Sequence, residues 1–462
     1  MSDAIFDSVV IGAGQAGPSL AVTLANRGEK VALIEVDRLG GTCINNGCTP
    51  TKTLRKSARV AYLARRAGEF GIETGPITVD FEKAMARMRE RVDSSRAGLD
   101  GWVRGNGVVV FSGRGKIDGR EGDDFCVAVG GQSIQTAKLF LNTGTRPFMP
   151  SIPGLADVPA LDNRSLLELD TLPRHLVIIG GSYIGLEMAQ IFRRLGAEVS
   201  VIEGGPALAS REDPDISAVI RQVLESEGIT VHTGTKIQGV SGGDGAITIE
   251  LEGAQVTGSH LLVATGRVPN TDDLGLDSVG LATGPRGHIN TNHRLETAVT
   301  GIWALGDING RGAFTHTSYH DFEIVAENLA GGTRSADDRV TAYAVFTDPP
   351  LGHVGIHRHA AQKLADEGRN ILIAEHDMKD VSRAKEESEL AGRIRIIVDG
   401  DSGQILGATI LGINGDEIVQ AFSNFIAAGG HWSAMRDALP VHPTVTEFIP
   451  TILAKLKPLE RS

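Results

Sequence analysis

Two cysteines, Cys43 and Cys48, lie in a glycine-rich segment that runs from Gly40 to Lys52. Zinc sites favour two cysteines only two residues apart with more cysteine or histidine nearby, and this segment has neither feature. A structural disulfide is not expected in a chain with three cysteines and a reducing compartment. We therefore predict that Cys43 and Cys48 form a redox-active pair. The third cysteine, Cys126, lies in a strand-like run, and we expect it to be a small buried hydrophobic residue.

A helical pattern from Thr51 to Arg65 follows the cysteine pair, and Pro50 suits the start of a helix. The partial positive charge at a helix N-terminus stabilises a thiolate. We therefore expect Cys48 to carry the thiolate, with Cys43 further out on the preceding turn.

A nucleotide-binding pattern precedes the cysteines. The β-branched run at 5–11 predicts a buried parallel strand, which leads into the glycine-rich turn Gly12–Gly17. A helix at 19–26 and a second strand at 31–34 follow, and this strand ends at Glu35. The order of strand, glycine turn, helix, strand and acid is the fingerprint of a dinucleotide-binding unit. The glycines let a pyrophosphate approach the helix N-terminus, and the acid accepts hydrogen bonds from a ribose.

The same unit recurs later in the chain. A strand at 176–179 leads into Gly180–Gly185, and a strand at 199–202 ends at Glu203. In both units the acid follows the first glycine by 23 residues. Two complete units with equal spacing predict two dinucleotide sites in one chain. The middle glycine of the second unit is replaced by Ser182, which is small enough for a phosphate to approach in a looser site.

Three further apolar strands end in similar turns. The runs at 139–144 and 261–266 both close on Thr-Gly, and the run at 302–305 ends at Gly306-Asp307. We expect the ends of these strands to lie beside the cofactors.

Charge and composition exclude other partners. The formal net charge is −12 and no basic patch dominates, so we expect no nucleic-acid partner. The chain has no run of 18 apolar residues, so we expect no membrane partner. The N-terminal residues lack the basic region and cleavage site of a signal peptide, and we expect a cytoplasmic protein.

These motifs together resemble the FAD-dependent pyridine nucleotide–disulfide oxidoreductases, which include dihydrolipoamide dehydrogenase, glutathione reductase and mercuric reductase. The resemblance runs essentially end to end. Its most specific parts are GGTCxNxGCxPxK at 40–52, ATGRxPN at 264–270, Gly306-Asp307 and HPTxxE at 442–447. It implies an enzyme that uses FAD and NAD(P)H.

The resemblance also implies an α/β fold with two Rossmann-like dinucleotide-binding domains and an α+β C-terminal dimerisation domain. The domains that it implies are 1–150 with 275–335 for FAD, 151–274 for NAD(P), and 336–462 for dimerisation. Strand-like runs at 393–398 and 408–411 and a helical run at 417–428 agree with the last of these.

Several catalytic residues follow from the same resemblance. His442 and Glu447 match an acid–base pair that serves the cysteines of the other subunit, so the resemblance implies a homodimer. Lys52 and Glu187 match a pair beside the flavin. The candidate FAD-binding residues are Gly12, Gly14, Gly17, Glu35, Gly41, Thr42, Lys52, Gly119, Thr143, Gly144, Asp307 and Thr315. The candidate NAD(P)-binding residues are Gly180, Gly181, Ser182, Tyr183 (a gate over the flavin), Ile184, Gly185, Glu203 and Gly266.

The substrate remains open between three classes. The His442–Glu447 element favours a small disulfide or dithiol, as in dihydrolipoamide dehydrogenase. A mercuric-reductase-like metal reductase is the alternative, although the C-terminus lacks the second cysteine pair of that group. A flavoprotein oxidase or transhydrogenase is the third. Glu203 favours NAD over NADP because it repels a 2′-phosphate, while Arg211 nearby keeps NADP possible.

Overall fold

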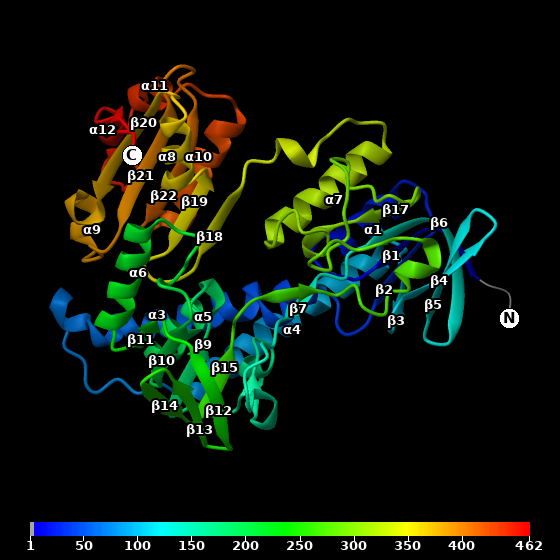
Figure 1. Cartoon of the computed structure of the whole chain (residues 1–462), viewed down its shortest axis with the longest axis horizontal. Coiled ribbons are helices and arrows are strands. Elements are labelled where there is room, and N and C mark those ends of the chain that lie inside the picture. Colours follow the sequence, from blue (N-terminus) through cyan, green and yellow to red (C-terminus); the bar gives the residue numbers. More distant parts are fainter. Residues whose placement is uncertain (1–3) are drawn as a thin grey trace.

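The computed structural model describes residues 4–462, so the expectation of no N-terminal targeting signal lies partly outside the described residues. Three groups of elements follow one another around the molecule (Figure 1). The first unit contains the N-terminal strands, the second unit lies in the middle of the chain, and the C-terminal part forms a six-stranded sheet. Within residues 4–462, no helix is long and apolar enough to cross a membrane.

The first unit is built on a sheet in the order β3-β2-β1-β6-β5-β4, with β17 also paired to β6. Strands β3, β2, β1, β6 and β17 run parallel, and β4 and β5 form an antiparallel hairpin. The bounds are β1 Ala4–Ile11, β2 Val31–Glu35, β3 Val109–Ser112, β4 Lys116–Glu121, β5 Asp124–Val129, β6 Gln132–Leu141 and β17 Ile302–Ala304. The strand predicted at 302–305 therefore joins the N-terminal sheet although about 160 residues separate it from β6.

Helices α1 (Ala16–Asn26) and α7 (Thr315–Leu329) contact each other beside this sheet. Val10, Leu20, Leu33, Phe140 and Ile324 are fully buried in one apolar core between sheet and helices. Continuous apolar strands such as 31–34 are typical of a sheet that is covered on both faces. Cys126 on β5 is half-buried, so the expectation of full burial was wrong: alternate residues of this hairpin strand face outwards.

The second unit repeats the arrangement with a parallel sheet in the order β11-β10-β9-β15-β8. Its elements are β8 Ala160–Leu161, β9 His175–Ile179, α5 Tyr183–Leu195, β10 Glu198–Glu203, α6 Pro214–Ser226, β11 Thr230–Thr233 and β15 His260–Val263. An antiparallel sheet of β12 (Ile237–Gly243), β13 (Ala246–Leu251) and β14 (Ala254–Gly258) packs beside it. The short strands β7 (Thr145–Pro147) and β16 (Arg267–Pro269) pair where the chain passes between the two units.

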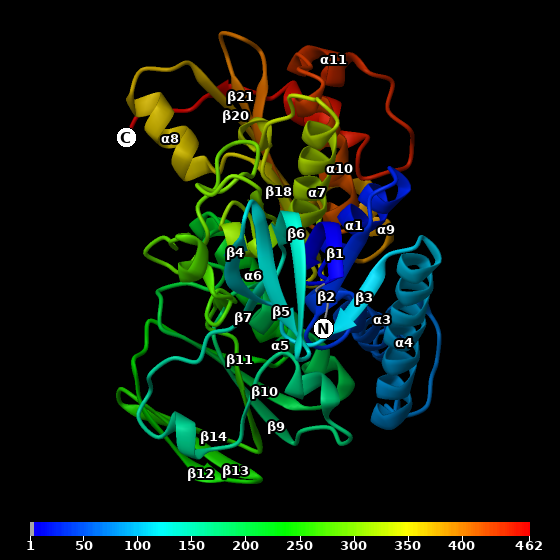
Figure 2. The same cartoon turned by 90° about the vertical axis from the view of Figure 1, so that its right-hand side faces the viewer.

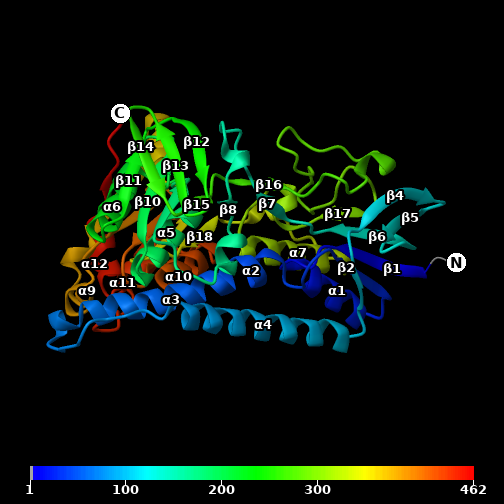
Figure 3. The same cartoon turned by 90° about the horizontal axis from the view of Figure 1, so that it is seen from below.

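Two long helices run along one side of the molecule (Figure 3). They are α3 (Cys48–Arg65) and α4 (Phe81–Gly105), and the short helix α2 (Gly41–Asn46) precedes them. Helix α3 contacts both α4 and α5, so it connects the two nucleotide-binding units. A side view shows α4 upright against the edge of the first sheet (Figure 2).

The C-terminal sheet is antiparallel in the order β18-β19-β22-β21-β20-β23. Its strands are β18 Ala342–Val345, β19 Leu351–Gly355, β20 Ile371–Asp377, β21 Arg393–Asp399, β22 Ile405–Leu411 and β23 Lys457–Pro458. The helices of this part are α8 Arg358–Asp366, α9 Ser382–Glu386, α10 Gly415–Ala427, α11 Trp432–Asp437 and α12 Phe448–Leu453. The α/β class and the two Rossmann-like units are as expected from the sequence.

Candidate active site

The cysteine pair lies where two helices meet end to end. Cys43 is in the short helix α2, and Cys48 is the first residue of α3. The expected helix therefore begins three residues earlier than Thr51, and Cys43 lies on a helix rather than a turn. Gly40 and Gly41 have positive φ angles of 100° and 54°, which permit the abrupt entry into α2. Both cysteines are half-buried thiols.

Hydrogen bonds separate the pKa values of the two thiols. The Cys48 Sγ lies 3.2 Å from the Thr315 Oγ1. Hydrogen bonds from Cys43 and Thr315, together with the charge of Lys52, outweigh burial and lower the pKa of Cys48 to about 6. The hydrogen bond to Cys48, and then burial, raise the pKa of Cys43 far above its ordinary value. At neutral pH the pair therefore loses one proton, and the negative charge resides on Cys48.

Lys52 is held in place one turn after Cys48. Its Nζ lies 2.8 Å from the Glu187 Oε2 on α5, and 4.3 Å from the centre of the Phe346 ring. The second carboxylate oxygen of Glu187 accepts the backbone N–H of Phe346 at 2.9 Å. Because Glu187 is buried, its carboxylate depends on these two donors.

A cavity of about 330 Å³ brings these groups together. Its lining includes Cys43, Cys48, Lys52, Glu187 and Thr315, although they come from three distant parts of the chain. A second cavity of about 440 Å³ adjoins it, because both are lined by Gly14, Thr42, Asn142, Gly144, Thr145 and Arg267. The two cavities form one elongated groove from the cysteines to Glu35.

Most of the predicted FAD-binding residues line this groove. They are Gly12, Gly14, Glu35, Gly41, Thr42, Lys52, Thr143, Gly144, Asp307 and Thr315. Gly17 lies just behind the lining, where a Cβ would come 2.1 Å from the Gly12 carbonyl oxygen. Gly119, also predicted to bind FAD, lies on β4 and does not line the groove. Gly113 and Gly115, which precede β4, line the groove instead.

The groove fits a dinucleotide such as FAD. A Cβ at Gly12 would come 2.3 Å from the Asn142 carbonyl oxygen, so the turn can form only with glycine there. The Glu35 Oε2 accepts the Ala13 N–H at 2.7 Å, which fixes the carboxylate at the end of β2. Burial raises the pKa of Asp307, whose Oδ2 accepts the Thr145 hydroxyl at 3.0 Å.

The second glycine turn has the same geometry. A Cβ at Gly185 would come 2.1 Å from the Gly180 carbonyl oxygen, the same distance that separates a Cβ at Gly17 from the Gly12 carbonyl oxygen. The Glu203 carboxylate accepts the N–H groups of Gly181 and Gly205, each at 2.7 Å. Ser182 is exposed, so no neighbour opposes the serine at this position. The first unit differs because a Cβ at Gly14 would come 3.0 Å from the Asn142 Oδ1.

A third cavity of about 520 Å³ lies at this second turn. Four of the predicted NAD(P)-binding residues line it: Ser182, Tyr183, Ile184 and Gly266. The other four do not line it and belong to the turn and the strand end beside it: Gly180, Gly181, Gly185 and Glu203. Four arginines also line it, Arg211, Arg267, Arg286 and Arg311, which gives the cavity the positive charge that a pyrophosphate needs.

The predicted acid–base pair forms at the C-terminus, away from these cavities. His442 Nδ1 lies 2.7 Å from Glu447 Oε2. His442 is 78% exposed and Glu447 is 12% exposed, so the imidazole faces outwards from a fixed carboxylate. The structure does not bring His442 to the cysteines of its own chain.

Sequence reasoning assigned no role to Arg267 or Phe314. Arg267 lines all three cavities, and its guanidinium donates to the Thr145 hydroxyl at 2.8 Å and the Thr145 carbonyl at 2.6 Å. Its place directly after the second Thr-Gly turn was a usable signal. Phe314 lies 5.7 Å from Tyr183 between ring centres, and only the folded chain reveals this contact.

Comparisons with known proteins point to one family over nearly the whole chain. Residues 6–321 match the pyridine nucleotide-disulphide oxidoreductase model, and 341–452 match its dimerisation domain, which supports a homodimer. The probable pyridine nucleotide-disulfide oxidoreductase RclA of Escherichia coli is 33% identical over 98% of this chain and 99% of its own. A dihydrolipoyl dehydrogenase of Chlamydia muridarum is 33% identical over 96% and 95%, and a mercuric reductase of Streptomyces lividans is 32% identical over 92% and 90%.

Solved structures agree as well. A structure of the HOCl-induced flavoprotein disulfide reductase RclA from Escherichia coli superposes with a TM-score of 0.88, at 33% identity over 98% of this chain and 100% of that one. The Cu(II) complex of the same protein gives a TM-score of 0.88, at 33% identity over 97% and 100%. The chain therefore belongs to the pyridine nucleotide–disulfide oxidoreductases, enzymes that depend on FAD and NAD(P)H.

Proposed function

We propose that this enzyme passes electrons between NADH and a small disulfide or dithiol, with a dihydrolipoamide-like substrate favoured. The observation that carries the proposal is the Cys43–Cys48 pair, whose two pKa values differ strongly within one cavity. Such a difference suits two distinct roles, one for the thiolate and one for the attacking thiol. The fixed His442–Glu447 pair supports thiol rather than oxidase chemistry.

FAD bound in the long groove supplies two-electron transfer between the nicotinamide and the cysteine pair. We assign residues 1–150 and 275–335 to its binding domain, residues 151–274 to NAD(P) binding and residues 336–462 to dimerisation. Lys52 and Glu187 would place a fixed positive charge beside Cys48 and the flavin, which stabilises negative charge as electrons arrive.

The reaction with a disulfide begins at Cys43. Its thiol must lose a proton before attack, and its raised pKa means that it needs a base. We assign that role to His442 of the partner subunit. The Cys43 sulfur then attacks one substrate sulfur, and the first thiol leaves with the proton from the imidazolium. The Cys48 thiolate attacks the Cys43 sulfur, which forms the Cys43–Cys48 disulfide and releases the second substrate sulfur as a thiolate that takes a proton from solvent. Oxidation of a dithiol by NAD⁺ is the reverse sequence.

The nicotinamide partner that we favour is NAD. The Glu203 carboxylate is fixed by two backbone N–H groups at the end of β10, where it can accept hydrogen bonds from ribose hydroxyls and repel a 2′-phosphate. Arg211 lines the third cavity together with Tyr183 and Gly266. That position favours a role at the pyrophosphate rather than at a 2′-phosphate.

A soft metal ion is the second candidate substrate. The E. coli relative with a TM-score of 0.88 has a structure described as a Cu(II) complex, and the S. lividans relative is a mercuric reductase. A dithiol with one thiolate suits such ions, since soft thiolates bind copper and mercury. In this reaction the Cys43 thiol and the Cys48 thiolate would give one electron to each of two Cu²⁺ ions, release the Cys43 proton to solvent and become the disulfide.

Steady-state turnover separates these candidates. Purified holoenzyme would be assayed anaerobically with NADH or NADPH plus lipoamide, oxidised glutathione or Cu²⁺, the last with a Cu⁺-specific chelator as readout. Reversible lipoamide turnover with NAD would support the favoured substrate. Cu⁺ production with inactive disulfides would replace it with metal reduction. NADPH preferred over NADH would contradict the assignment of Glu203.

A further inference from the structure

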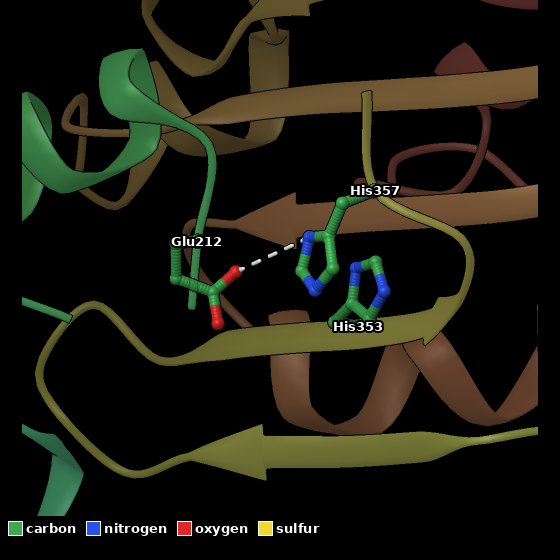
Figure 4. A group of neighbouring side chains, drawn as sticks. All are labelled: Glu212, His353 and His357. Atoms are coloured by element: carbon green, nitrogen blue, oxygen red, sulfur yellow. Dashed lines mark ion pairs between the residues drawn. The ribbon is translucent and has the colours of Figure 1, made fainter. Parts of the chain in front are cut away.

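A compact group of polar side chains lies where the second nucleotide-binding unit meets the C-terminal sheet (Figure 4). Glu212 precedes α6, His353 is on β19, and His357 precedes α8. Their ligand atoms lie within 4.8 Å of one another, and Glu212 and His353 are buried. None of the three lines the cavities that hold the cysteines and the nucleotide turns.

The hydrogen bonds of the Tyr343 hydroxyl determine the tautomer of His357. The Tyr343 hydroxyl lies 2.6 Å from the Glu212 Oε1 and 3.1 Å from the His357 Nε2. A hydroxyl has one proton, and the shorter contact to a carboxylate takes it. The Tyr343 oxygen must then accept from His357 Nε2–H. His357 Nδ1 is therefore the unprotonated nitrogen.

Two lone pairs then face each other. His357 Nδ1 lies 3.9 Å from Glu212 Oε2, and both atoms are buried without a hydrogen-bond partner among residues 4–462. Two facing acceptors repel each other unless something positive lies between them. A metal-binding histidine usually donates its other N–H to a fixed acceptor, as His357 does to Tyr343.

His353 supports this arrangement but does not ligate. Its Nε2 donates to the Gly355 carbonyl at 3.1 Å, and its Nδ1 accepts the Thr409 hydroxyl at 2.9 Å. Its ring stacks on that of His357 at 3.7 Å, with only 3° between the planes. A metal ion binds in the plane of an imidazole, so one ion cannot serve two rings stacked in parallel. Burial is the main reason that the pKa of His353 is lowered to about 3.

The neighbouring charges leave Glu212 available. Asp213 is satisfied by Arg395 at 2.7 Å and by the N–H groups of Arg358 and His359. Glu212 forms no ion pair with an arginine or lysine within residues 4–462. Burial is the main reason that the pKa of Glu212 rises to about 7, and the charges of Asp213 and Arg211 act in opposite directions on it.

We propose that Glu212 Oε2 and His357 Nδ1 bind one divalent transition-metal ion, with solvent completing its coordination. Metal bonds to a histidine nitrogen and a carboxylate oxygen are each about 2.0–2.2 Å, so an ion between the two atoms reaches both across 3.9 Å. The nitrogen and oxygen donors suit Zn²⁺ or Cu²⁺. The His357 side chain is 15% exposed, so the site lies near the surface although both ligand atoms are buried.

Binding of Cu²⁺ to the full-length oxidised holoenzyme tests the proposal. The Cys43–Cys48 disulfide removes the thiolates that would otherwise bind copper. Untagged protein would be dialysed against a chelator and then titrated at pH 8, with electron paramagnetic resonance as readout. We expect one Cu²⁺ per chain with an imidazole nitrogen signature. His357→Phe keeps the ring stack but removes the nitrogen, so affinity should fall at least about tenfold. His359→Phe is the matched control, because this exposed imidazole also stacks on His357, at 5.5 Å between ring centres, and it should bind as the wild type.

Glu212→Gln is a second variant, chosen in case His357→Phe fails to fold. The amide can still accept from Tyr343 and can donate to His357 Nδ1, so this variant should fold but bind copper at least about tenfold more weakly. Zn²⁺ should raise the Tm of the wild type and leave that of Glu212→Gln unchanged. Copper bound equally by both variants and the wild type, or not bound by the wild type, would overturn the proposal.

Discussion

The Thr315 hydroxyl lies 3.2 Å from Cys48 Sγ, although 267 residues separate the two in the chain. Thr315 is the first residue of α7 and Cys48 is the first residue of α3. The two helix starts meet in the cavity where the flavin groove ends. The Thr315 hydroxyl therefore donates a hydrogen bond to the Cys48 thiolate. The sequence pattern by itself pairs Cys48 only with Cys43.

The Cys48 thiolate should titrate near pH 6. Its pKa is lowered from the ordinary value, so the thiolate is present above about pH 6 and is lost as the pH falls through that value. In two-electron-reduced enzyme the thiolate–flavin charge-transfer absorbance reports this titration. Thr315→Val removes a donor, and we expect the midpoint to rise by about one pKa unit.

Thr53→Val is the control for that titration. Thr53 is also on α3, but its hydroxyl donates to the Thr49 carbonyl and not to a cysteine. Its midpoint should match that of the wild type. An unshifted Thr315→Val midpoint would mean that Cys43 and Lys52 alone hold the thiolate. Cys48→Ser should abolish the band while FAD stays bound, and a persistent band would assign the thiolate to Cys43.

Much of the nucleotide-binding framework could be predicted because its signals are local. The turn at Gly12 and the acid at Glu35 lie in one strand–helix–strand unit, where chain geometry fixes their relation. The same holds for Gly180 and Glu203. Cys43 and Cys48 were also recognisable from their spacing, although the short helix α2 was not.

Contacts between distant elements could not be predicted in the same way. The 5.7 Å approach of Tyr183 to Phe314 depends on how α5 and the segment before α7 pack. Nothing in the local sequence around His357 indicates that Glu212 will face it across two domains. Such contacts follow from tertiary packing, which periodicity does not encode.

The Lys52–Glu187 pair should contribute to stability as well as to catalysis. Lys52→Met leaves the Glu187 carboxylate buried with one donor fewer, at a cost of about 1–3 kcal/mol. The Tm, followed by release of flavin fluorescence, should therefore fall by a few degrees.

Two further variants make that measurement specific. Lys52→Met combined with Glu187→Gln removes both charges and should recover most of the lost Tm. Lys83→Met breaks an exposed pair with Asp80, so it should change the Tm very little. Equal losses from Lys52→Met and Lys83→Met would show that burial of Glu187 is not decisive.

Glu203 should set the choice of nicotinamide. Glu203→Ala removes the acceptor for ribose hydroxyls and the charge that repels a 2′-phosphate. We expect kcat/KM for NADH to fall about tenfold or more, and the ratio of NADPH to NADH activity to rise. Glu198→Ala at the exposed start of the same strand is the control and should leave both values unchanged. An unaltered preference in Glu203→Ala would remove this residue from nucleotide selection.

His442 should matter only for the half-reaction with the substrate. It lies outside the cavities of its own chain, so His442→Ala should be reduced by NADH at the wild-type rate. Turnover with a disulfide should fall about 10²–10⁴-fold, because Cys43 then lacks a base for its raised pKa. Glu447→Gln keeps the imidazole but weakens its orientation and charge, and a smaller loss is expected. His431→Ala, an exposed histidine paired with Ser433, should react normally. Stopped-flow reduction and steady-state turnover separate the two half-reactions, and near-normal turnover of His442→Ala would require another base at Cys43.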